Sequence, residues 1–191
     1  MKTQSILFAG IGGQGIIRAS SILATAAINE GMDVKQSEVH GMAQRGGSVV
    51  SFVRFGDKVY SPTIEKGTAD VVLAFEKSEA LRWLDYLKPD GFIMINNMMI
   101  KPTSLIYGKV KYPQVDKIKD ALDGINYLFM DSIQEARSLG NAKVFNTIML
   151  GVISKYIDIK QDNWINAIKR SVPPKTVETN LKAFEFGINY K

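Results

Sequence analysis

The first 140 residues alternate between short apolar runs and longer segments in which apolar residues recur every three or four positions. Short β-rich runs predict strands, and the spacing of three or four predicts helices. The strands expected from this pattern cover residues 5–9, 33–38, 48–55, 70–75, 92–95 and 126–130. The helices expected between them cover residues 16–30, 78–87, 114–122 and 132–139. This regular alternation predicts an α/β fold with parallel strand pairing.

Two segments argue against a purely parallel sheet. The strand at 33–38 carries Lys35 and Gln36, whereas a buried central strand should be apolar. Gly56 and Asp57 form a predicted turn, after which residues 58–60 are expected to return as a short antiparallel partner. We therefore expect a three-layer α/β/α architecture with a Rossmann-like, mostly parallel but mixed sheet.

The last fifty residues have a different pattern. Helical spacing is present at 144–156, 162–170 and 177–186, and no strand is predicted there. Such a short segment is unlike an independent domain, because it buries too little apolar surface. The chain is therefore expected to be a single domain over residues 1–191, with a sheet core at about 1–140 and additional C-terminal helices, at about 141–191, packed on it.

Composition limits the chemistry of the chain. Among 191 residues, 24 are Lys or Arg and 19 are Asp or Glu, and the net charge of +5 is low for a nucleic-acid-binding domain. This excess of positive charge suits an anionic ligand or an acidic partner. The absence of Cys excludes thiolate nucleophiles and cysteine-held iron–sulfur clusters, and a single His excludes a multi-histidine metal site. Redox chemistry would therefore depend on groups held by another chain.

The beginning of the chain has some features of a secretion signal, namely Lys2 and an apolar stretch. Four glycines, Gln14 and Arg18 interrupt that stretch. No run approaches the ~20 apolar residues of a membrane-spanning helix, and lipidation signals are absent. A cytoplasmic protein without membrane contact is expected.

Gly10, Gly12 and Gly15 satisfy the pattern G-x-G-x-x-G between a predicted strand and a predicted helix. Glycines there allow a tight turn and leave free amides at the positive end of a helix, which suits a phosphate or carboxylate. The same turn also serves close packing in any βα unit, so both interpretations stay open. A dinucleotide site would need an acid about 20 residues later, a position near Glu38.

The segment from His40 to Ser48 combines a His, a Gln, an Arg and two adjacent glycines beyond the end of a predicted strand. Arg45 has a planar guanidinium suited to a phosphate or carboxylate, and His40 titrates near neutral pH. The alternative is that Arg45 pairs with an acid of the same fold and His40 is an ordinary loop residue. Glu76 and Glu79 are interpreted as solvated helix charges. Asn146, Lys175 and Asn180 are interpreted as residues that cap helices or tie the C-terminal helices to the sheet.

Three segments together carry a family resemblance: residues 10–15, residues 38–49 and residues 178–187. They resemble the gamma domain of 2-oxoacid:ferredoxin oxidoreductases, and within that family the small subunit of the indolepyruvate (aryl-2-oxoacid) type. The resemblance extends from about residue 5 to residue 187. It implies a subunit of an enzyme that oxidatively decarboxylates a 2-oxoacid, forms an acyl-coenzyme A and passes electrons to ferredoxin.

The resemblance also implies which groups lie elsewhere. Thiamine diphosphate, Mg and iron–sulfur clusters are expected in a large companion subunit, and no cofactor is expected to be held by this chain alone. Ferredoxin is an indirect partner, and coenzyme A is a candidate ligand. The isolated chain should be inactive, and no catalytic residue is assigned to it. An aryl-pyruvate substrate is favoured, while pyruvate, 2-oxoglutarate and branched-chain 2-oxoacids remain alternatives.

One surface is expected to face the large subunit or an anionic group of coenzyme A or substrate. Its residues are Gly10, Gly12, Gly13, Gln14, Gly15, His40, Gln44, Arg45, Gly46, Gly47 and Ser48. Two rival functions stay open: a stand-alone NAD(P)-dependent oxidoreductase that uses Glu38, and a nucleic-acid-binding module. The second would use the lysines at 101, 109, 111, 117 and 119.

Overall fold

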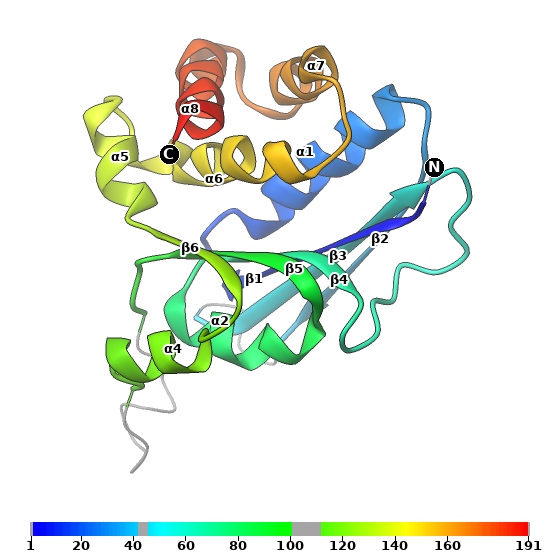
Figure 1. Ribbon diagram of the computed structural model, residues 1–191. Coiled ribbons are helices and arrows are strands. Elements are labelled where there is room, and N and C mark those ends of the chain that lie inside the picture. Colours follow the sequence, from blue (N-terminus) through cyan, green and yellow to red (C-terminus); the bar gives the residue numbers. More distant parts are fainter. Residues whose placement is uncertain (1, 42–45, 101–111, 191) are drawn as a thin grey trace.

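The computed structural model describes residues 2–41, 46–100 and 112–190, and within them a six-stranded sheet forms the centre of the molecule (Figure 1). The strand order is β2-β3-β1-β4-β5-β6. The strands are β1 (Gln4–Ile11), β2 (Asp33–His40), β3 (Ser48–Gly56), β4 (Ala69–Ala74), β5 (Leu87–Asn96) and β6 (Asn126–Met130). All six strands expected from the sequence are present.

The sheet is mixed because β3 runs opposite to its neighbours. It pairs antiparallel with β1 on one side and with β2 on the other, whereas β1, β4, β5 and β6 pair in parallel. The prediction that residues 58–60 form the antiparallel partner was wrong, since they form no strand. The hairpin from β2 to β3 supplies the antiparallel pairing instead. Residues 88–91, predicted as a turn, lie within β5, where the pairing with β4 shifts register.

The polar character of β2 follows from its place at the edge of the sheet. Lys35 and Gln36 pair with Arg54 and Val53 of β3, and no described strand covers the other side of β2. An edge strand is partly solvated and therefore carries polar side chains, which also discourage pairing with other proteins. The sequence pattern that was unusual for a central strand is ordinary at this position.

Helices cover both faces of the sheet. On one face lie α1 (Ile16–Asn29), α5 (Ser132–Ser138) and α6 (Phe145–Ile153), with α7 (Gln161–Ser171) packed mainly on α1 and α8 (Val177–Asn189) mainly on α6. On the other face lie α2 (Lys77–Trp83) and α4 (Val115–Ala121). Figure 1 shows these layers, with α7 and α8 farthest from the sheet. The three-layer prediction is confirmed, and the last two helices add to one face.

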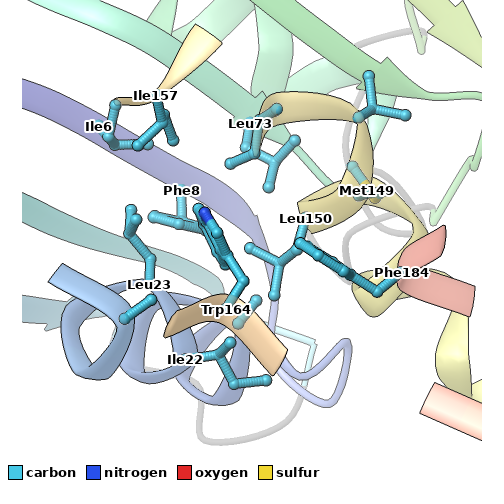
Figure 2. Packing of buried hydrophobic residues seen from close by; sticks show 14 of the residues in the cluster. Ile6, Phe8, Ile22, Leu23, Leu73, Met149, Leu150, Ile157, Trp164 and Phe184 are labelled. Carbon is cyan, nitrogen blue, oxygen red and sulfur yellow. The ribbon is translucent and has the colours of Figure 1, made fainter. Parts of the chain in front are cut away.

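Alternating side chains of the central strand feed two separate apolar cores. Ile6 and Phe8 point toward α1 and α6, whereas Leu7 and Ala9 point toward α2 and α4. All four side chains are completely buried, as expected for a strand covered on both faces. In the larger core, the Trp164 ring of α7 lies among side chains of the sheet, α1 and α6 (Figure 2), with its centroid 5.6 Å from that of Phe184.

α6 and α8 approach each other closely where Gly151 faces Gly187. A Cβ built on Gly151 would lie 2.2 Å from the Phe184 carbonyl oxygen, and one on Gly187 would lie 2.1 Å from the Ile148 carbonyl oxygen. Only hydrogen atoms fit there, so the two backbones touch. None of the helices in the described ranges combines the length and the apolar content that crossing a membrane requires.

Candidate functional site

The glycine turn after β1 and the hairpin between β2 and β3 meet at one end of the sheet. Ile11 pairs with Ser48, and His40 pairs with Val49, so the end of β1 lies beside the beginning of β3 and the end of β2. The Gly12 amide donates to the Gly47 carbonyl at 2.9 Å. Two motifs separated by about 30 residues thus form one continuous surface.

Gln14 supports this surface from the inside. Its side chain is buried: Oε1 accepts a hydrogen bond from the Ile11 amide at 2.6 Å, and Nε2 donates to the Phe75 carbonyl at 2.9 Å. The same Nε2 lies 3.1 Å from the Met98 sulfur. The sequence-based expectation placed Gln14 on the outer surface, whereas the structure uses its amide to join the glycine turn to the end of β4.

Three of the glycines have steric reasons to lack a side chain. A Cβ on Gly10 would meet Gln14 Oε1 at 2.6 Å, so Gly10 makes room for the Gln14 side chain. Gly13 and Gly15 have positive φ angles of 98° and 79°, which residues with a Cβ rarely adopt. A Cβ on Gly13 would contact nothing, so that position is open to the outside. Gly15 is the residue from which α1 begins.

A cavity of about 810 Å³ lies against the turn and the first turns of α1. Its lining combines backbone of Gly12, Gly13 and Gly15 with apolar side chains and a few polar ones. The other lining residues are Ile16, Ile17, Arg18, Ser21, His40, Val49 and Ser171. The volume falls in the range of small-molecule sites in proteins, which is about 300–1,000 Å³.

Two hydrogen bonds of Ser48 fix the hairpin. Gly41 donates its amide to the Ser48 carbonyl at 2.8 Å, and the Ser48 hydroxyl donates to Glu79 Oε2 at 2.6 Å. His40, which is about half exposed, lies 3.6 Å from Glu38 Oε2 through its Nε2 atom. Gly46 and Gly47 complete this edge, while Gln44 and Arg45 lie outside the described residues.

Glu76, which precedes α2, and Glu79 within it are both buried, contrary to their interpretation as solvated charges. Glu79 accepts from Ser48 and, at 3.3 Å, from the Trp83 indole, and it pairs with Arg82. Burial removes the water that would otherwise donate to the Glu79 carboxylate, and these three groups replace it. The donor from Ser48 comes from another element, so the burial of Glu79 could not be predicted from the helix pattern.

Glu76 caps the start of α2 from the end of β4. Its carboxylate accepts from the Ser78 and Glu79 amides at 2.7 and 3.2 Å, and from the Ile100 amide at 3.1 Å. The Tyr112 hydroxyl also donates to Glu76. Burial of the Tyr112 ring, the hydrogen bond to Glu76 and the charge of Glu76 raise the pKa of Tyr112 above its ordinary value of 10.0.

The polar residues of the C-terminal helices tie α6 to α8, whereas the sequence interpretation expected them to cap helices or tie these helices to the sheet. Thr147 Oγ1 donates to Asn180 Oδ1 at 2.7 Å, and Asn180 Nδ2 donates to the Thr176 carbonyl at 2.8 Å. Asn146 is buried beside Gly15: a Cβ on Gly15 would lie 2.6 Å from Asn146 Nδ2. Lys175 lies in an exposed 3₁₀ turn away from the cavity lining.

The topology disfavours a dinucleotide site. In the dinucleotide-binding fold, the second strand lies beside the first, which brings its terminal acid next to the glycine turn. Here β3 lies between β1 and β2, and Glu38 contacts Gln36 and His40. Among the described residues, no group of three or more His, Asp or Glu side chains is placed to hold a metal ion.

The chain matches the family model described as pyruvate ferredoxin/flavodoxin oxidoreductase over residues 5–190. It is 38% identical to indolepyruvate oxidoreductase subunit IorB of Thermococcus kodakarensis, across 98% of this chain and 96% of that protein. The IorB subunit of Archaeoglobus fulgidus is 36% identical, across 97% and 94% of the two chains. The gamma subunit of a keto/oxoacid ferredoxin oxidoreductase from Geobacter sulfurreducens has a similar structure, with a TM-score of 0.71, 26% identity and coverage of 96% and 95%.

Proposed function

Because the chain belongs to the pyruvate ferredoxin/flavodoxin oxidoreductase family, we propose that it is the small subunit of a 2-oxoacid:ferredoxin oxidoreductase. The proposed substrate of the complex is an aryl 2-oxoacid such as indolepyruvate. The observation that carries this proposal is the 38% identity to an indolepyruvate oxidoreductase subunit over nearly the full length of both chains. Relatives named as subunits of pyruvate and 2-oxoglutarate synthases are less similar, at 28–30% identity.

In the proposed reaction, a 2-oxoacid and the thiol of coenzyme A give an acyl-coenzyme A, carbon dioxide, a proton and two electrons, which pass to ferredoxin. Thiamine diphosphate with Mg and iron–sulfur clusters would supply this chemistry. The donor set of this chain does not fit a cluster, since it contains no Cys and one His. We therefore place these groups in a companion subunit. We also propose that the complex is cytoplasmic.

The surface formed by the glycine turn and the hairpin is the proposed contribution of this chain. It offers free backbone amides at the start of α1, the Arg18 side chain and a cavity of ligand size. It faces the large subunit or an anionic group of coenzyme A or substrate. The β2–β3 hairpin carries Arg45, whose guanidinium would pair with such an anion or with an acid of the partner.

A tagged chain recovered anaerobically from its native cells tests the function. We expect a large, Cys-rich, thiamine-diphosphate-bearing subunit to copurify at a fixed ratio, identified by mass spectrometry. The isolated complex should reduce an electron acceptor only when both an aryl 2-oxoacid and coenzyme A are supplied. A chain that purifies alone and binds NAD(P) tightly would contradict the proposal and favour a stand-alone oxidoreductase.

The role of Arg45 is tested in the same complex. Arg45→Met should leave the chain folded but weaken assembly with the large subunit or raise the concentration of coenzyme A needed for half-maximal rate. Arg137→Met, at an exposed position of α5, is the matched control and should change neither quantity. If Arg45→Met and Arg137→Met behave alike, the anion or partner contact does not involve Arg45.

A further inference from the structure

A second cavity, of about 500 Å³, lies at the end of the sheet opposite the glycine turn. Ser5, Asp70 and Lys88 line it from the beginnings of β1, β4 and β5, and Arg54 lines it from the end of β3. The loop between β3 and β4 and the chain before β1 complete the lining. The volume lies within the range of small-molecule sites, about 300–1,000 Å³. The proposed function uses the other end of the sheet and leaves this cavity without a role.

Arg54 brings to this cavity a positive charge that no described carboxylate neutralises. Its Nε donates to the Ser5 hydroxyl at 3.2 Å, and its Nη1 donates to the Ser61 and Thr63 carbonyls at 3.1 and 3.0 Å. Within the described ranges, Nη2 has no hydrogen-bond partner, and no Asp or Glu lies within 4.0 Å of the guanidinium. Three neutral acceptors therefore hold a half-buried cation in place and leave two of its N–H donors unused.

The other buried charges of the cavity neutralise one another. One carboxylate oxygen of Asp70 accepts from a β1 amide at 2.7 Å, and the other lies 2.9 Å from Lys88 Nζ. Lys88 also lies 3.5 Å from Asp90, which is exposed and outside the lining. Asp70 and Lys88 therefore satisfy each other and leave the Arg54 charge unbalanced.

Two exposed residues complete the charge of the lining. Lys2 and Glu65 form no ion pair with any described residue. With the pair of Asp70 and Lys88 set aside, Arg54 and Lys2 face Glu65, which leaves one positive charge in excess. A ligand with a single negative charge matches this excess. A phosphate group carries about −1.5 to −2 charges at neutral pH and would be only partly neutralised.

The uncharged part of the lining is polar. Thr3, Thr63 and Thr68 contribute hydroxyl groups, and the described residues of the lining include no aromatic or large aliphatic side chain. The cavity beside the glycine turn differs in this respect, because Ile17 and Val49 line it. An aryl group would gain little from the second cavity, whereas ligand hydroxyls would find donors and acceptors there.

We propose that this second cavity binds a small hydroxylated monocarboxylate. The ligand carboxylate accepts from Arg54 Nη2 and pairs with the Lys2 ammonium, and the ligand hydroxyls exchange hydrogen bonds with Thr63 and Thr68. The site lies at the end of the sheet away from the glycine turn, and its ligand differs in polarity from an aryl 2-oxoacid. The inference therefore goes beyond the proposed function and does not rest on it.

The test uses the full chain and sodium glycerate as the probe, at constant ionic strength and neutral pH. Titration followed by ¹H–¹⁵N NMR should give saturable shifts of the Ser5, Thr63 and Thr68 amides and of the Arg54 Nε–H signal. Glycerol has comparable hydroxyls but no charge, so it should leave these signals in place. Inorganic phosphate should bind more weakly than glycerate, because the cavity offers one excess positive charge.

Arg54→Gln removes the charge that the ligand carboxylate needs, and we expect it to weaken glycerate binding by about tenfold or more. Lys66→Gln is the matched control: Lys66 belongs to the same loop but pairs with Asp85 and does not line the cavity, so binding should be unchanged. Because Arg54 also holds the loop, Lys2→Gln provides a second variant that leaves those bonds intact. It should weaken binding by several-fold.

Three results would overturn the inference. The first is the absence of saturable shifts at millimolar glycerate, and the second is tighter binding of phosphate than of glycerate. The third is equal weakening by Lys2→Gln and Lys66→Gln, which would indicate nonspecific attraction to positive charge. If circular dichroism shows that Arg54→Gln does not fold, wild-type affinity in Lys2→Gln would equally contradict the proposed ion pair. These measurements use the chain alone, so a negative result leaves the proposed function intact.

Discussion

At the scale of single residues, Gln14 sets the shape of the glycine turn. Its amide group satisfies the Ile11 amide and the Phe75 carbonyl, two backbone groups that belong to different strand ends. Both are in a buried region, where an unpaired polar group costs stability. The Gln14 side chain therefore links the end of β1 to the end of β4 on the inner side of the glycine turn.

Replacing Gln14 by Leu preserves the approximate volume and removes both bonds. We expect the free energy of unfolding to fall by about 1–3 kcal/mol, because the buried Ile11 amide loses its bond to Gln14 and the Phe75 carbonyl keeps only the longer bond from Asn96, at 3.3 Å. Urea unfolding followed by circular dichroism measures the change. Gln161→Ala, at an exposed position on α7, is the control and should stay within about 0.5 kcal/mol of wild type. A Gln14→Leu protein as stable as this control would show that the bridge is dispensable.

Tyr112 makes the stability of the chain sensitive to alkaline pH. Its pKa is raised in the folded protein, so the unfolded chain releases this proton at a lower pH than the folded chain does. The contribution of the neutral phenol is fully present below pH 10 and is lost as the pH rises toward the folded pKa. Wild type should therefore lose stability more steeply above pH 10 than Tyr112→Phe.

Urea unfolding between pH 8 and pH 11.5 checks this expectation. The advantage of wild type over Tyr112→Phe should shrink as the pH rises through this interval. Tyr60→Phe is the control, because Tyr60 is 87% exposed, and its pH profile should follow that of wild type. Parallel profiles for wild type and Tyr112→Phe would contradict the link between Tyr112 and Glu76.

At the scale of elements, the contact between α6 and α8 depends on two glycines. Gly151→Ala places a methyl group against the Phe184 carbonyl, so the helices must move apart or tilt. We expect a loss of about 1–3 kcal/mol, the usual cost of overpacking, even though Ala is the better helix former. Thermal unfolding measures it, and Glu185→Ala on the exposed side of α8 is the control. A stabilised Gly151→Ala protein would mean that the helices separate without cost.

The elements themselves were largely predictable, because apolar periodicity reports burial along a strand or helix directly. The order of the strands in the sheet could not be predicted from this periodicity. β3 lies between β1 and β2, and the Gly-rich sequence that connects β2 to β3 carries no signal for the direction of the next strand. The polar edge strand β2 was the one available hint, since Lys35 and Gln36 do not suit a central position.

The candidate site was predicted in outline, since the glycine turn and the hairpin do meet. Its supporting residues were missed for a physical reason. Glu76, Glu79 and Asn146 are recognisable only through partners distant in sequence, such as Ile100, Ser48 and Gly15. A polar side chain on a helix is solvated by default, and only the tertiary fold shows that it is buried.

At the scale of the whole molecule, the sheet is shared by two apolar cores, and each core contains one of the two tryptophans. Trp164 lies in the core with α1, α6, α7 and α8, and Trp83 packs against the core with α2 and α4. Because β1 and β4 contribute to both cores, unfolding of one face should disrupt the other.

Single-tryptophan variants test this cooperativity. In Trp83→Phe, the fluorescence of Trp164 and the far-ultraviolet circular dichroism should give the same urea midpoint, and the same should hold for Trp83 in Trp164→Phe. Each variant is compared with itself, so the loss of stability from the substitution does not affect the result. Fluorescence and circular dichroism midpoints that differ within one variant would mean that the two faces unfold separately.

The bridge formed by Gln14 also bears on how quickly this surface can act. Before any ligand or partner arrives, the glycine turn is held by the Gln14 side chain, which accepts from the Ile11 amide and donates to the Phe75 carbonyl. The Gly12 amide, which donates to the Gly47 carbonyl, holds it as well. A preorganised loop loses little conformational entropy on association, and encounter need not await a slow rearrangement. The association rate at this end of the sheet should therefore be set by diffusion and charge, and differences in affinity among variants should appear in the dissociation rate.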